Sequence, residues 1–245
     1  MADKYDNRTQ FGSFTPGTTT SVPRAARDVG LRSYMLSVYN LMGSGVLWTG
    51  IVALGLAMSG IAASLWSSGL GIVFALAPLA FVVILGFRWQ KMSTGAQRTT
   101  FWAFATVMGV SMSVIPLIYS GVSIAQTFFA TAVAFGSLSL WGYTTKKDLS
   151  GWGTFLIMGV VGLIVAIVFN LFLQSAALDF AISAIGVLIF AGLTAYDTQK
   201  IKSIYAHVAH SADDTRRAIT MGALMLYLDF INMFQFLLTF MGGRE

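Results

Sequence analysis

One carboxyl group lies in the middle of the apolar C-terminal segment. Asp229 is the only charged residue between Arg217 and Arg244. A carboxylate at the centre of a membrane helix costs at least about 2.5–3.5 kcal/mol, so it must pair with a cation, take up a proton or meet water. Ionisable groups at this depth mark ion or proton pathways, which makes Asp229 a candidate site residue. The alternative is a protonated side chain that only joins two helices by a hydrogen bond.

A second acid and one cation follow neighbouring apolar runs. Asp197 comes after the run that ends at Tyr196, and Arg88 comes after the run that ends at Phe87. By position alone they are a solvated acid and a cationic anchor at a membrane surface. The helix dipole disfavours an acid at a helix C-terminus, so Asp197 should have a compensating partner. We predict that Arg88 pairs with Asp197, and that Asp197 can alternatively share a proton with Asp229. Two such acids titrate as a coupled pair, which is the chemistry of a proton sensor.

Three other polar side chains come into question. Asn232 lies three residues after Asp229, where its amide can hydrogen-bond the carboxyl or join two helices. His207 and His210 lie close to two aspartates, a set that could bind a metal, but a solvated loop is the simpler interpretation. The chain has no cysteine, which excludes disulfides, thiolate nucleophiles and Cys-ligated metals.

The elements that hold these groups must be membrane helices. The 245 residues are 56% hydrophobic and 10% charged, whereas a soluble domain carries about 25% charged residues. So few charges cannot cover this apolar surface in water, which excludes a disordered chain, a nucleic-acid-binding protein and a typical cytosolic enzyme. The continuous apolar runs exclude barrel strands, in which apolar residues alternate. The sequence predicts an all-α, polytopic integral membrane protein.

Charges and small polar turns divide the apolar sequence into seven predicted membrane helices. A span needs about 20 residues, and the uncharged stretch 33–87 breaks at Ser59-Gly60 and at Ser67-Ser68-Gly69. We expect residues 1–29 to form a polar cytoplasmic tail, residues 30–245 a single membrane domain, and Asp197–Arg217 the longest charged loop. The predicted spans are Tyr34–Met58, Leu70–Phe87, Phe101–Ile118, Val122–Tyr143, Trp152–Leu173, Phe180–Tyr196 and Ile219–Met241.

These boundaries set the depth of the two acids. Asp229 is about the eleventh residue of the last span, roughly 16 Å from its start and near the bilayer midplane. Asp197 lies more than one turn nearer the membrane surface. Contact between the two acids therefore requires the sixth helix to run further than predicted, or the seventh to begin later.

The cations give the expected orientation. Fourteen of the fifteen lysines and arginines fall on one side of the predicted spans, and only Arg244 falls on the other. The positive-inside rule then places the N-terminus in the cytoplasm and the C-terminus outside. Glycines within the spans are expected to pack helices closely. They are Gly43, Gly45, Gly50, Gly55, Gly159, Gly162, Gly186 and Gly192.

Four motifs resemble the Bax inhibitor-1 family, also called the transmembrane Bax inhibitor motif family, in its bacterial YccA/YetJ-like branch. The likeness covers about residue 24 to the C-terminus, and the YD and YLDF motifs in successive spans are its most specific part. The motifs are LYLDFINMFQFLLTF (226–240), AYDTQKIK (195–202), GFRWQK (86–91) and KKDLS (146–150).

The resemblance implies seven transmembrane helices with the last helix surrounded by the other six. Some members of the family behave as pH-sensitive Ca²⁺ leak channels. In these, the acids of the two motifs form a di-aspartyl sensor that pairs with a basic residue ending the second helix. The matching positions here are Asp197, Asp229 and Arg88. Another branch is similar to a modulator of a membrane-bound ATP-dependent protease.

We therefore expect a pH-sensitive calcium leak channel rather than an enzyme. Calcium prefers oxygen ligands, so Asp197 and Asp229 are also the expected calcium ligands, without any further cofactor. The expected partners are the lipid bilayer, calcium ions and a membrane protease, but no nucleic acid. The resemblance places the protein in a bacterial inner membrane, with the C-terminus in the periplasm. An intramembrane aspartyl protease is disfavoured because its second Asp follows Gly-x-Gly, whereas Asp229 follows Tyr227-Leu228.

The alternative function is a membrane-embedded regulator of a membrane protease or of a stress response, without channel activity. The polar tail and the loop between the sixth and seventh spans would then be its docking surfaces. Removal of residues 1–23 separates the two hypotheses, since a leak should survive this loss and a tail-dependent interaction should not.

Overall fold

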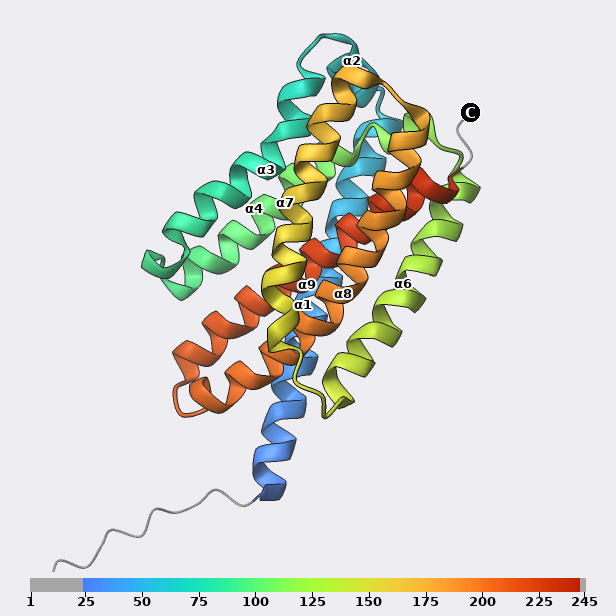
Figure 1. Cartoon of the computed structure of the whole chain (residues 1–245). Coiled ribbons are helices and arrows are strands. Elements are labelled where there is room, and N and C mark those ends of the chain that lie inside the picture. Colours follow the sequence, from blue (N-terminus) through green and yellow to red (C-terminus); the bar gives the residue numbers. More distant parts are fainter. Residues whose placement is uncertain (1–23, 243–245) are drawn as a thin grey trace, which may run out of the picture.

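Helices make up the whole architecture of the part that the structure, a computed structural model, describes, which is residues 24–242 (Figure 1). Seven helical segments in that range are long and apolar enough to cross a membrane, α4 and α5 together forming one of them. The predicted all-α class and the seven spans are confirmed. The elements are α1 (Arg24–Met58), α2 (Ile61–Ser67), α3 (Gly71–Arg88), the 3-10 turn η1 (Trp89–Lys91), α4 (Thr94–Met112), α5 (Ile115–Ile118), α6 (Gly121–Thr144), α7 (Ser150–Leu173), α8 (Ala176–Val208) and α9 (Ala212–Met241).

The predicted interruption between the first two spans contains a glycine at each of its two breaks. Gly60 and Gly69 have φ angles of 76° and 80°, in the left-handed region that favours glycine. They enclose the short helix α2, which connects the two spans. The third span is interrupted between α4 and α5, two residues before Pro116, whose ring nitrogen cannot donate a helical hydrogen bond.

The prediction of a charged loop over residues 197–217 is wrong. Helix α8 continues to Val208 and α9 already begins at Ala212, so only three residues separate them. The extension contains no glycine or proline, and Ile201, Ile204 and Tyr205 recur at helical spacing, so its charges do not end the helix. The Ser211 hydroxyl accepts a hydrogen bond from the Asp214 backbone N–H and caps α9.

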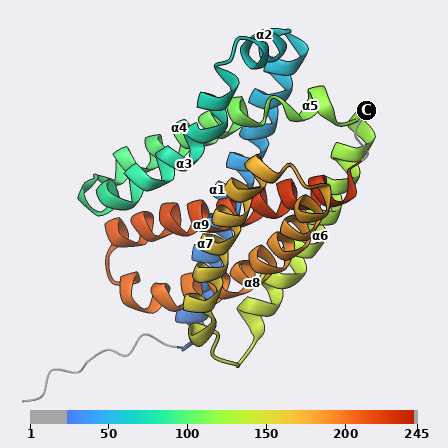
Figure 2. The same cartoon turned by 45° about the horizontal axis from the view of Figure 1, so that its top comes forward.

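Helix α9 lies at the centre of the bundle, as the resemblance implied. In the most apolar 18-residue stretch of α9, 50% of the residues are buried, whereas in that of α7 only 11% are buried. Its extensive contacts are with α8, α1, α6 and α4, while α7 packs on α8 and α3 packs on α4 as an outer layer. Figure 2 shows α9 passing between these helices.

The two ends of the bundle differ in charge. The N-terminal end of α1, the α3–α4 connection, the α6–α7 link and the α8–α9 turn lie away from α2 and from the end of α9 (Figure 1). We call this the cation-rich end, because the lysines and arginines of the described residues belong to these segments. Of the predicted tail 1–29, residues 1–23 lie outside the described residues, as does Arg244, whereas residues 24–29 form the start of α1.

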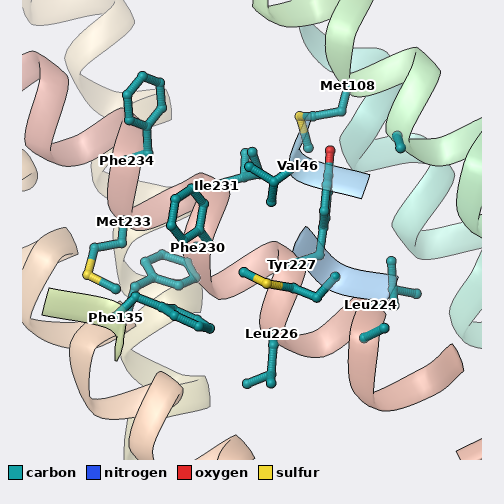
Figure 3. Close-up of a cluster of buried hydrophobic side chains, with 14 of the residues drawn as sticks. Val46, Met108, Phe135, Leu224, Leu226, Tyr227, Phe230, Ile231, Met233 and Phe234 are labelled. Carbon is teal, nitrogen blue, oxygen red and sulfur yellow. The ribbon is translucent and has the colours of Figure 1, made fainter. Parts of the chain in front are cut away.

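The core around α9 is aromatic and contains one buried hydroxyl pair. The Tyr227 ring makes edge contacts with Phe101 and Phe104 of α4. The Tyr227 hydroxyl lies 2.6 Å from Thr49 Oγ1, which itself donates to the Ala105 carbonyl, so Tyr227 is the donor to Thr49. Figure 3 shows Tyr227 within this cluster, with Phe230, Phe135 and Phe234 further along it. Three spans are thereby joined at one level of the bundle.

Two buried tyrosines provide a matched test of this hydroxyl pair. Tyr227→Phe removes a made hydrogen bond and should lower the free energy of unfolding by about 1 kcal/mol. Tyr34→Phe should be neutral or stabilising, because the buried Tyr34 hydroxyl has no partner among the described residues. Thermal unfolding of both variants in one detergent measures the difference. An equal loss of stability in the two variants would contradict the hydrogen-bond assignment.

Only part of the predicted glycine packing is present. A Cβ atom at Gly45, Gly159, Gly186 or Gly192 would collide with a neighbouring side chain, so these glycines do bring helices together. Gly43, Gly50, Gly55 and Gly162 have nothing within 4 Å of a built Cβ, so for them the prediction is wrong. The closest approach of two backbones is at Gly142 of α6, which lies against the Ala195 backbone of α8.

Candidate functional site

The two acids of the predicted sensor lie close together inside the bundle. Asp197 on α8 is 8% exposed and Asp229 on α9 is 3% exposed. Gly222 of α9 faces Ile201 of α8, and further along Phe236 faces Gly186, so the two helices are antiparallel in a known register. This register puts the levels of the two acids about one helical turn apart. Asp229 is within electrostatic range of Asp197.

Helix α8 meets the condition that contact between the acids required. It runs eleven residues beyond Asp197 before it ends, so Asp197 lies within the helix and not at its end. The predicted helix-end position of Asp197, and with it the dipole argument for a partner, is therefore wrong. The two acids nevertheless come within range, because the long α8–α9 hairpin brings them to within about one helical turn of each other.

The carboxyl groups of Asp197 and Asp229 have no close cationic partner within residues 24–242. Neither makes an ion pair in the part of the chain that the structure describes, and Asp229 Oδ2 is buried without a hydrogen-bond partner. The nearest cation acting on Asp197 is Lys200, an exposed residue one turn further along α8. Two buried carboxylates at this separation repel each other, so the arrangement suits a pair in which one of the two carboxyl groups is protonated.

Arg88 does not join the pair in this structure. Its side chain is exposed at the end of α3, and it has no ion pair within the described range. Helix α3 packs mainly on α4, on the outside of the bundle. The next residue, Trp89, is buried, and its carbonyl accepts a hydrogen bond from Gln97 Nε2 of α4. The expected Arg88–Asp197 pairing is therefore absent from this arrangement of the helices.

The remaining predicted polar groups lie apart from the acids. The Asn232 amide donates to the Leu228 carbonyl of its own helix at 2.8 Å, not to Asp229. His207 and His210 are exposed around the α8–α9 turn, and Asp213 is held by Thr94 and Arg217. Residues 24–242 contain no group of three acids or histidines that could hold a metal.

Three residues that follow Asp197 fasten α8 to its neighbours. Thr198 and Ser139 of α6 share a hydrogen bond of 2.9 Å, and Ser139 lies 2.6 Å from the Tyr39 hydroxyl of α1. Gln199 donates to the Lys147 carbonyl and accepts from the Leu149 N–H. Lys202 donates to the Tyr143 carbonyl at 2.7 Å.

The sequence analysis missed this positioning role. The signal was available, because all three residues belong to the polar run that directly follows the YD motif. The run was interpreted as a loop, so its side chains were not expected to face neighbouring helices.

Asp148, an acid outside the spans, can serve as a control for the Asp197–Asp229 pair. Asp148 lies in the link before α7, where its Oδ1 accepts from the Ser150 N–H at 2.9 Å. Hydrogen bonds from Ser150 lower the pKa of Asp148 below its ordinary value. Asp148 therefore stays charged at neutral and mildly acidic pH, unlike a pair that shares a proton.

Known proteins resemble the chain over almost its whole length. The family model described as inhibitor of apoptosis-promoting Bax1 matches residues 31–245. An uncharacterised protein of Caulobacter vibrioides is 43% identical, over 96% of this chain and 100% of the relative. An uncharacterised protein of Rickettsia prowazekii is 41% identical, over 95% and 98%. The inner membrane protein YbhL of Escherichia coli is 42% identical, over 91% and 95%.

Proposed function

Because the chain belongs to the Bax inhibitor-1 family of integral membrane proteins and buries two acids within electrostatic range of each other, we propose that it is a calcium leak controlled by protonation of Asp197 and Asp229. The proposal rests on the buried acid pair at the centre of the bundle, which makes no ion pair among the described residues. A stable membrane domain retains such a costly group for ion or proton movement more often than for packing. The proposed role is not enzymatic.

Calcium is the cargo in this proposal and not a resident ligand. A lasting Ca²⁺ site has six to eight oxygen ligands, whereas the pair supplies two carboxyl groups and the described residues add no third acid. A partly hydrated Ca²⁺ ion can replace the shared proton for a short time and then leave. Protons and calcium ions would therefore compete for the same oxygens.

The gate is proposed to have two states. In the first proposed state one of the two carboxyl groups is protonated, which removes the repulsion between the acids. Loss of that proton creates two neighbouring charges, and the bundle can relieve this by separating α8 from α9 or by moving a cation toward the pair. Arg88 is the proposed cation of the second state, because α3 lies in the outer layer and packs mainly on α4.

The membrane and the orientation are proposed as well. The relative from Escherichia coli is named an inner membrane protein, and we place this protein in a bacterial inner membrane on that similarity. The cation-rich end would face the cytoplasm, with the N-terminus on the same side and the C-terminus in the periplasm. Protons from the cytoplasm would then reach the pair through that end.

The test is calcium flux into liposomes that hold the purified protein, measured at pH 6 and pH 8. We expect flux above that of empty liposomes, with a clear difference between the two pH values. Asp148→Asn is the matched control and should behave as wild type, because the low pKa of Asp148 keeps it charged at both pH values.

The absence of flux from folded protein at both pH values would overturn the proposal. The alternative function, a regulator of a membrane protease or of a stress response, would then be the better one. Crosslinking in membranes, with and without residues 1–23, would be the next measurement, because it tests for a protein partner directly.

A further inference from the structure

Two hollows lie between α1 and α6, at different depths of the bundle. The one nearer the cation-rich end has a volume of about 390 Å³, and its walls include Arg32, Met35, Tyr39, Gly136, Ser139 and Tyr143. We call it the α1–α6 groove. The second hollow, of about 450 Å³, lies further along and reaches Phe230 of α9. Phe135 lines the first hollow and Phe230 the second, and their rings are in contact (Figure 3).

The α1–α6 groove opens sideways into the membrane. Leu36 and Leu140, on its two walls, are 50% and 64% exposed, and both belong to membrane-spanning helices. The groove is open at Gly136, where a Cβ atom would meet nothing within 4 Å. Lipid is the solvent at this position, so an acyl chain is the molecule that meets the groove.

One end of the groove is cationic and most of the rest is apolar. Arg32 is exposed and makes no ion pair among residues 24–242, although Asp28 lies one turn before it on α1. Tyr39, Ser139 and Tyr143 are the other polar residues of the groove's lining. A cation at the membrane surface and an apolar trench below it complement an amphiphile with an anionic head.

We propose that the α1–α6 groove binds an anionic phospholipid of the leaflet at the cation-rich end. The phosphate would lie at Arg32, and one acyl chain would lie along Met35 and Gly136. Arg32 and Tyr39 are about 10 Å apart along α1, so the polar wall faces the head and glycerol region. The proposal does not depend on calcium conduction.

The test is lipid retention by the full-length protein, measured by native mass spectrometry after purification in a mild detergent. Phosphatidylglycerol and phosphatidylcholine with the same acyl chains are the two probes. Wild type should retain phosphatidylglycerol preferentially. Arg32→Gln should lower its apparent affinity by roughly tenfold or more, because a charge-assisted contact is lost.

Two leucine substitutions test the groove itself. Gly136→Leu should expel both lipids by filling the groove. Gly162→Leu on α7 is the matched control, because Gly162 also has open space around its Cβ and lies outside the groove, so it should retain lipid as wild type does. Thermal unfolding verifies that each variant is folded.

Three results would overturn the proposal. They are equal retention of the two lipids by wild type, unchanged phosphatidylglycerol retention in folded Gly136→Leu, and unchanged retention in folded Arg32→Gln. A final measurement adds inorganic phosphate at millimolar concentration as a competitor of phosphatidylglycerol. If it displaced phosphatidylglycerol completely, the site would be one for a free anion and not for a lipid.

Discussion

Replacement of Asp229 by asparagine is expected to abolish the pH dependence of calcium flux. The amide has nearly the shape of a protonated carboxyl group but cannot release a proton at pH 6 or pH 8. The flux of the variant should therefore be the same at the two pH values, within the error of the liposome assay. Asp148→Asn, measured in parallel, should keep the response of wild type.

The partner acid should give the same phenotype. Asp197→Asn also leaves only one titratable group, so no proton can be shared and the response should be lost. The double variant should behave like either single variant, because the two residues act as one unit and their effects do not add. A pH response that persists in both single variants would exclude the pair as the sensor, even if calcium flux itself were observed.

Arg88→Gln removes the cation that we propose for the deprotonated state of the pair. If Arg88 stabilises the deprotonated state, its removal should change the flux at pH 8 more than at pH 6. An equal change at both pH values would indicate that Arg88 acts only as an anchor at the membrane surface, which was the simpler interpretation of its position.

The second large effect is expected at Gly142, where α6 meets α8. A methyl group at this position would overlap the carbonyl oxygen, carbonyl carbon and Cα of Ala195, which are backbone atoms and cannot rotate away. Gly142→Ala should therefore separate the two helices and lower the free energy of unfolding by about 3 kcal/mol. The substitution also displaces the segment of α8 that precedes Asp197, so calcium flux should change in the protein that remains folded.

Gly136 provides the matched control on the same helix. A built Cβ there has nothing within 4 Å, so Gly136→Ala should stabilise α6 by up to about 1 kcal/mol through helix propensity alone. Thermal unfolding of both variants in one detergent measures the contrast. A similar unfolding temperature for the two would mean that α6 and α8 do not approach as closely as the structure shows.

The span pattern could be predicted from the sequence because it depends on local chemistry. A hydrocarbon environment admits only long apolar segments. Gly60 and Gly69, which adopt positive φ angles, mark the break between the first two. The error at 197–217 has the same origin. Charge density was taken as a sign of a loop, but the apolar positions at 201, 204 and 205 show that a helix continues past the membrane surface.

That Asp229 lies within an apolar helix could also be predicted, but its surroundings could not. Asp229 is conspicuous in any apolar segment, since burial of an unpaired charge is costly whatever the fold. Whether Arg88, Asn232 or Asp197 lies beside it depends on how the helices are arranged. Asn232 satisfies its amide on its own helix, and Arg88 remains outside with α3.

The sequence by itself determined the helical class, the number of spans and which side chains are too costly to bury without a function, because each of these follows from the transfer of single residues into lipid. Only the tertiary structure decided that α8 and α9 meet in a register that brings Asp197 to Asp229, that Gly142 allows α6 to close on α8, and that α1 and α6 leave a groove beside Arg32. These are properties of helix packing, in which the positions of residues far apart in the chain depend on the side chains between them.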